Sequence, residues 1–196
     1  MARHPVIATL AAALLAAAAP ALATVLVPAG FGELAREALA IVHGRVVDVR
    51  SEWVDGRKRI ETVVTLDVQA ALKGQPGSTV SVRVPGGEMG RYRSIVIGAP
   101  RFREGEEVVL FLGGRAPAVP HLLGLTQGVY RVMREPGTGR ALVTPPAIAA
   151  ATGVVPRGDV SRRPLTMGEF AQQVTAAVGA RDKERSRPVS RQGRGR

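Results

Sequence analysis

Cysteine is absent from the 196-residue chain. This absence excludes a disulfide scaffold, a thiolate nucleophile and any metal site with cysteine ligands. Aromatic residues make up only 4% of the sequence, too few for the platform of rings on which single-stranded nucleic acids stack. A folded core must therefore consist mostly of Val, Leu, Ile and Ala. The overall balance, 45% hydrophobic and 22% charged, is that of a globular protein.

The motifs of well-known enzyme classes are also missing. The glycines of PGGEMG at 85–90 precede an expected strand, not a helix whose N-terminus could hold phosphate. No G-x-S-x-G element is present to hold a nucleophilic serine. Glu104, Glu106 and Glu107 surround Gly105, and we expect them in a solvated turn rather than as paired catalytic acids. We therefore assign no catalytic residue and no cofactor.

Histidine is scarce as well. Only His43 and His121 lie outside the N-terminal segment, and no expected helix carries two histidines at metal-binding spacing. We therefore predict no metal site. One alternative stays open: a metal held by His43, His121 and a carboxylate such as Glu88. In that case the chain would be a secreted hydrolase or a metal-dependent accessory protein.

The first 23 residues have the three parts of an export signal. Arg3 and His4 form a short basic start, an apolar run covers 6–19, and Ala-Leu-Ala at 21–23 has the small-x-small pattern of a cleavage site. The run is shorter than the roughly 20 residues that cross a bilayer. We predict a signal peptide at 1–23, cleaved after Ala23, and a mature chain that does not span the membrane. It would work in the periplasm or outside the cell, where genomic DNA is not an expected partner.

The charge of the chain is strongly basic. Its net value is +11, which favours anionic partners. Nearly half of this excess lies in the last sixteen residues, which hold seven Lys or Arg against two Asp or Glu. Because residues 181–196 have almost nothing to bury, we predict a disordered basic tail there. The preceding stretch, 24–180, has the length of a single domain.

Valine-rich alternation predicts that this domain is mainly β. Strands are expected near 41–53 and 58–70, with a bulge near Gly44, and Asp55-Gly56 between them is typical of a hairpin turn. Apolar patterns predict the remaining strands at 80–84, 94–99, 106–112, 121–134 and 141–144. The continuous apolar run EEVVLFL at 106–112 is expected to be central and covered on both faces.

One helix is expected on each side of the strands. Residues 31–40 have apolar side chains three and four positions apart, as in a helix with one buried face. A second helix is expected to begin after Thr166, because Thr166 and Glu169 form a capping box and Leu165 can pack on Phe170. Its end is predicted at Gly179.

Four arginines bracket the strand expected at 94–99, with Tyr92 and Phe102 among them. These candidate binding residues are Arg91, Arg93, Arg101 and Arg103. Guanidinium groups gathered in this way suit an anion-binding surface. The alternative is an ordinary solvated sheet edge, whose charges discourage aggregation.

Four segments, IVHGRVVDV, TVVTLDVQAALKG, STVSVRVPGG and FREGEEVVLFL, together resemble the netrin and tissue metalloproteinase inhibitor type domains. The resemblance covers roughly 41–112 and implies an OB-fold barrel. Inhibitors of this type chelate zinc through an N-terminal cysteine, whereas this chain has no cysteine and an expected Thr24 start, so no inhibitory residue is assigned. The stretch VPGGEMGRYRSIVIGAPRFREGEEVVLFL also resembles a family of uncharacterised exported bacterial proteins, which implies no activity.

These observations predict a mainly β protein, a small OB-like antiparallel barrel, closed or partly open, with one helix before it and one after it. We expect an exported, non-enzymatic binding or interaction module whose partner is a protein or an anionic component of the cell envelope. Two alternatives stay open. One is the hydrolase or metal-dependent accessory protein, and the other is an anion-binding cell-envelope protein that uses the four arginines and the basic tail.

Overall fold

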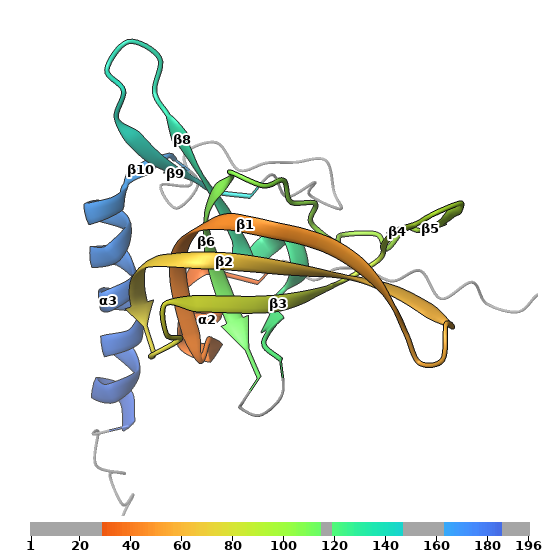
Figure 1. Cartoon of the computed structure of the whole chain (residues 1–196). Helices are drawn as coiled ribbons and strands as arrows, with labels where there is room; N and C mark the ends of the chain where they lie inside the picture. Colours follow the sequence, from red (N-terminus) through yellow and green to blue (C-terminus); the bar gives the residue numbers. More distant parts are fainter. Residues whose placement is uncertain (1–28, 115–118, 147–162, 186–196) are drawn as a thin grey trace, which may run out of the picture.

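The computed structural model describes residues 29–114, 119–146 and 163–185 (Figure 1). The predicted signal peptide at 1–23 and residues 186–196 of the predicted tail lie outside this part. In chain order the elements are α2 (Phe31–Glu37), β1 (Ala40–Val54), β2 (Arg59–Lys73), β3 (Thr79–Pro85), β4 (Gly87–Met89), β5 (Tyr92–Ser94), β6 (Glu107–Gly113), β7 (His121–Leu122), the 3-10 helix η1 (Leu125–Gly128), β8 (Val129–Arg134), β9 (Ala141–Thr144), β10 (Leu165–Thr166) and α3 (Met167–Arg185).

Five of the strands form a ring. β1 pairs with β2 and with β6, β2 pairs with β3, and β6 pairs with β7, all of them antiparallel. The ring returns from β7 to β3 through one parallel residue pair, Arg83 opposite His121, where the Arg83 N–H donates to the Pro120 carbonyl at 3.2 Å. The structure thus confirms a mainly β, OB-like barrel of the partly open kind, with one helix before it and one after it.

The long β1–β2 hairpin follows the sequence prediction closely. Asp55, Gly56 and Arg57 all have positive φ in the turn. The last residue pair of the hairpin is Val54 with Arg59, so the turn has four residues. The pairing register shifts between His43 and Gly44, which is the predicted bulge. A Cβ at position 44 would lie 2.5 Å from the Asp67 carbonyl oxygen, so glycine allows the two strands to approach. Two further register shifts occur in β1, between Ile41 and Val42 and between Val46 and Asp48. Such irregularities bend the strand, and β1 pairs with both β2 and β6.

Strand β6 separates two hydrophobic cores, which confirms the prediction for 106–112. On one face, Val108, Leu110 and Leu112 point into the barrel core with the valines of β1 to β3. On the other face, Val109 and Phe111 pack under the helices. All five side chains are at most 2% exposed.

The second core collects most of the few aromatic residues. Four rings from α2, β6, β8 and α3 contact one another with centroids 5.1–6.3 Å apart: Phe31, Phe111, Tyr130 and Phe170. Helix α3 is positioned for this contact by the predicted capping box. The Thr166 N–H donates to Glu169 Oε2 at 2.8 Å, and the Glu169 N–H donates to Thr166 Oγ1 at 3.3 Å. Leu165 and Phe170 are buried in this same core, as expected.

The strand expected at 94–99 does not form. The chain instead makes the short β4–β5 hairpin and then turns, with the Ala99 N–H donating to the Val96 carbonyl at 3.1 Å and Gly98 at positive φ. The Gly98 carbonyl accepts hydrogen bonds from Thr126, so this backbone finds partners without joining a sheet. The strand expected at 121–134 is similarly interrupted, because η1 separates β7 from β8.

The predicted end of the second helix at Gly179 was also wrong. Helix α3 continues to Arg185, so residues 181–185 are helical although they were assigned to the tail. Gly179 does not take the left-handed conformation that would end the helix. The residues after it are mostly Ala, Arg, Lys and Glu, which are good helix formers.

Candidate functional site

The β4–β5 hairpin and the chain around it form a cover over one end of the barrel. We call residues 86–106, which connect β3 to β6, the cover segment. A pocket of about 380 Å³ lies beneath it. Its floor is made by Val49 and Ser51 of β1, Thr62 of β2 and Val84 of β3, and residues of the cover segment form its roof. Figure 1 shows the β4–β5 hairpin and the β1–β2 turn on the side of the molecule opposite to α3.

Two hydroxyl groups hold the first part of the cover segment. The Ser51 Oγ accepts a hydrogen bond from the Glu88 N–H at 3.1 Å, and the Thr62 hydroxyl donates to the Gly86 carbonyl at 2.8 Å. The Gly86 N–H also donates to the Ile60 carbonyl at 3.0 Å. The two hydroxyls lie 3.3 Å apart, so they act together as a clamp on the backbone.

Glycine is required where the clamp closes. Gly86 and Gly87 have φ values of +90° and +146°. Residues with a Cβ rarely adopt such backbone conformations. A Cβ on Gly87 would also collide with the hydroxyls of Ser51 and Thr62. The glycines therefore allow the hairpin to lie directly against β1 and β2.

The second part of the cover segment is held from β8 and η1. Arg131 forms an ion pair with Glu106, donates from Nη2 to the Arg101 carbonyl at 2.7 Å, and lies 5.9 Å from the centroid of the Phe102 ring. Phe102 is itself buried in the barrel core. Together with the bonds from Thr126 to Gly98, these contacts fix the segment at its middle and at its end.

Between these attachment points the chain exposes an aliphatic tip, formed by Ile95, Val96 and Ile97. Ile97 is 94% exposed and Ile95 69%. Apolar side chains are usually exposed singly and scattered over a surface. Here adjacent β-branched residues face water on a segment that hydrogen bonds hold in place.

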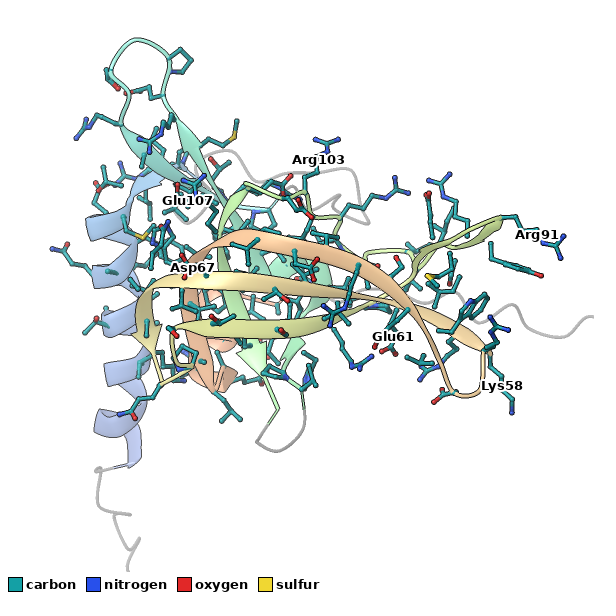
Figure 2. The ribbon with its side chains drawn as sticks, in the orientation of Figure 1. Lys58, Glu61, Asp67, Arg91, Arg103 and Glu107 are labelled. Carbon is teal, nitrogen blue, oxygen red and sulfur yellow. The ribbon has the colours of Figure 1, made fainter. Side chains whose placement is uncertain are left out.

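The structure brings two of the four predicted arginines to the pocket. Arg93 and Arg101 line it, whereas Arg91 and Arg103 do not. Arg93 forms an ion pair with Glu88 at 3.0 Å, and the Arg91 guanidinium lies 5.1 Å from the centre of the Tyr92 ring. Within the described ranges, Arg91, Arg101 and Arg103 have no carboxylate at ion-pair distance. Figure 2 shows Arg91 and Arg103 pointing away from the protein body.

The charges of the neighbouring β1–β2 hairpin are largely paired. Arg83 of β3 forms ion pairs with Glu52 and Glu61, and Arg59 pairs with Asp55 at 2.7 Å. The side-chain hydrogen bond with Glu52 raises the pKa of Arg83 above its already high ordinary value. These carboxylates are therefore engaged within the hairpin and with Arg83, and not with Arg91, Arg101 or Arg103.

The alternative metal ligands do not meet. His43 is buried and its Nε2 lies 2.7 Å from Glu107 Oε1. His43 of β1 pairs with Val109 of β6, and His121 of β7 pairs with Gly113 of β6. These two β6 positions are four residues apart, which is about 13 Å along the strand. Glu88 is paired with Arg93 on the hairpin. In the part of the chain that the structure describes, no three His, Asp or Glu side chains are grouped as metal ligands would be.

The sequence singles out the four arginines as candidates but does not reveal the aliphatic tip or the hydroxyl clamp. The run of β-branched residues at 95–97 indicates a strand, and nothing local shows that no neighbour will pair with it. One signal was available, because Gly98 and Pro100 follow directly and both interrupt extended structure. Ser51 and Thr62 carry no such signal, since ordinary strands contain many hydroxyl residues.

Comparison with known proteins adds no relative: no family model, curated protein or solved structure matches the chain. No helix in the described ranges has both the length and the apolar character needed to cross a bilayer.

Proposed function

We propose that the chain is an exported, non-enzymatic binding module that contacts its partner through the cover segment. The observation that carries this proposal is the exposed aliphatic tip, in which Ile97 is 94% exposed although its segment is fixed on both sides. A contiguous apolar surface with a polar rim is a common mark of an interaction site. Transferring an isoleucine side chain out of water is favourable by about 1.5–3 kcal/mol.

The use of the nearby polar groups supports binding rather than catalysis. Ser51 and Thr62, the hydroxyls of the pocket floor, hydrogen-bond the backbone of the cover segment. His43 is paired with Glu107 inside the β1–β6 region. The groups at the outer surface of the cover segment are guanidinium groups and aliphatic side chains, which recognise a partner by charge and by burial. OB-like barrels commonly bind through the loops that connect their strands.

The N-terminal sequence supports export. The basic start, the apolar run over 6–19 and the Ala-Leu-Ala at 21–23 form the pattern of a cleaved signal. We propose that the mature chain begins at Thr24 and meets its partner in the periplasm or outside the cell. The resemblance of 41–112 to netrin-type domains is part of the same proposal, as a statement about the fold.

Retention of the exported chain on the envelope fraction of its own cells tests this function. We expect the wild type to sediment with that fraction and Ile97→Asp to lose at least about tenfold in retention, because a charge replaces the apolar contact. Met133→Asp is the matched control, since Met133 is 58% exposed near the end of β8, where the strand pairs with β9.

Two results would contradict the proposed function. One is equal retention of the Ile97→Asp and wild-type chains. The other is turnover of a substrate in a broad hydrolase panel that disappears when a single acid or histidine is replaced. The second result would favour the hydrolase alternative instead.

A further inference from the structure

We propose that the surface contacted by the cover segment is an anionic lipid bilayer, with the aliphatic tip entering the hydrocarbon and the arginines binding lipid phosphates. This inference rests on the proposed function and names its partner. It is drawn from the combination of two features on one short segment: the exposed side chains of Ile95 and Ile97, and the uncompensated charges of Arg91, Arg101 and Arg103.

The local charge balance favours an anionic surface. The cover segment holds four arginines and three glutamates. Two of the glutamates are neutralised, Glu88 by Arg93 and Glu106 by Arg131, which leaves Glu104 against three arginines. Each cation close to an anionic membrane strengthens binding by about fivefold. The guanidinium group also suits phosphate, because it can donate two parallel hydrogen bonds.

The nearby aromatic residues fit the same surface. Tyr92 is 50% exposed and its ring meets that of Trp53 edge-on, with centroids 5.4 Å apart. Tyrosine and tryptophan are enriched at the level of lipid headgroups, where one end of the ring system is apolar and the other is hydrated. The pair joins the β4–β5 hairpin to the end of β1, so both hairpins can face one membrane surface.

The other candidate partners use only part of this surface. A wall polysaccharide or another polyanion would pair with the arginines but offers no apolar phase for Ile97. A stable protein interface needs about 800 Å² from each partner, more than a tip of three aliphatic side chains supplies. A bilayer accepts a small apolar tip without a shaped groove, and the fixed backbone of the cover segment needs no ordering on insertion.

Vesicle sedimentation with the exported chain tests the inference. One vesicle population is phosphatidylcholine alone, and the other is phosphatidylcholine with phosphatidylglycerol in equal parts. We expect binding to the anionic vesicles only, weakening as salt is raised. Trp53, the single tryptophan of the chain, should shift its emission to shorter wavelength on binding. Mass spectrometry of the same sample confirms that the apolar N-terminal segment is absent.

Matched variants locate the contact. We expect Ile97→Asp to weaken vesicle binding by at least about tenfold and Arg101→Gln or Arg103→Gln by about fivefold each. Met133→Asp and Arg134→Gln, which change exposed residues of β8 in the same ways, should bind as the wild type does. Because Ile97 is almost fully exposed, its replacement should leave the fold intact, and the far-UV circular dichroism spectrum checks this.

The outcomes separate this inference from the proposed function. Vesicle binding that Ile97→Asp leaves unchanged would overturn the inference, because it would come from other basic residues such as those near the C-terminus. A second outcome would also overturn the inference: the chain does not bind vesicles, but its retention on envelope fractions still depends on Ile97. The proposed function would then stand, with a protein or a polymer as the partner. Loss of both signals would reject both proposals.

Discussion

Gly87 determines whether the β4–β5 hairpin can lie on the barrel. Its φ of +146° and the closeness of the Ser51 and Thr62 hydroxyls leave no space for a Cβ. Gly90, at the turn of the same hairpin, also has positive φ but no atom within 4 Å of the position a Cβ would take. A Cβ would therefore strain the backbone at both positions, but only at position 87 would it also collide with other atoms.

We predict that Gly87→Ala destabilises the fold by about 2–3 kcal/mol and that Gly90→Ala costs about 1 kcal/mol. The collision at position 87 should also release the hairpin and change the environment of Trp53, which contacts Tyr92. Urea denaturation gives the first quantity, and the native emission spectrum of Trp53 gives the second. Equal effects of the two substitutions would show that the hydroxyl clamp does not constrain the hairpin.

The predictability of the site also differs from residue to residue. Arginines stand out in any sequence, so Arg93 and Arg101 could be selected before the structure placed them at one pocket. Ile95 and Ile97 could not, because a run of β-branched apolar residues has the same appearance in a buried strand and in an exposed turn. A strand forms only where a neighbouring strand supplies hydrogen-bond partners. Here the Gly98 carbonyl is instead bound by the N–H and hydroxyl of Thr126, and the segment turns.

At the scale of elements, helix α3 illustrates which signals are local. Its start was predicted correctly because a capping box is complete within four residues, Thr166 to Glu169. Its end was not, because a glycine permits termination without enforcing it. The paired strands β1, β2, β3 and β6 were also predictable, because the valine-rich alternation of β1 to β3 and the continuous apolar run of β6 are both visible within each segment. The strand expected at 94–99 failed because pairing is not a local property.

The capping box gives helix α3 a pH dependence. Hydrogen bonds from the Thr166 backbone N–H and hydroxyl hold the pKa of Glu169 below its ordinary value, with a smaller contribution from Arg163. A carboxylate whose pKa is lowered by folding stabilises the folded state above its unfolded pKa, and this contribution is lost as pH falls through the lowered folded value. Glu169→Gln should therefore reduce Tm by a few degrees at neutral pH.

The same substitution should have little effect once the pH is below both pKa values, where Glu169 is protonated in the folded and unfolded chain. Thermal unfolding followed across that range checks the sign. Glu33, in the first turn of α2 and without a side-chain cap bond, offers the matched control Glu33→Gln. A difference in Tm that persists unchanged into acid would show that the capping bonds do not depend on the charge.

At the scale of the whole molecule, β6 joins the two cores. Its inward residues belong to the barrel and its outward residues to the aromatic core under α2 and α3. A sheet strand cannot lose the packing on one face and keep its position on the other, since the same backbone holds both sets of side chains. The two cores should therefore unfold together, as expected of the single domain predicted at 24–180.

Phe111→Ala tests this coupling from the helix side. Phe111 is fully buried and contacts Phe31, Tyr130 and Phe170, so its truncation should cost about 3–5 kcal/mol. Trp53 lies at the far end of β1 and contacts none of these rings. The midpoint of urea unfolding followed by Trp53 fluorescence should nevertheless fall by the same amount as the midpoint followed by far-UV circular dichroism.

Met133→Ala, an exposed truncation on β8, is the control and should move neither midpoint. If Phe111→Ala lowered the helical signal and left the Trp53 transition in place, the barrel and the helical layer would be independent units, because β6 would then hold the barrel without the packing on its outer face.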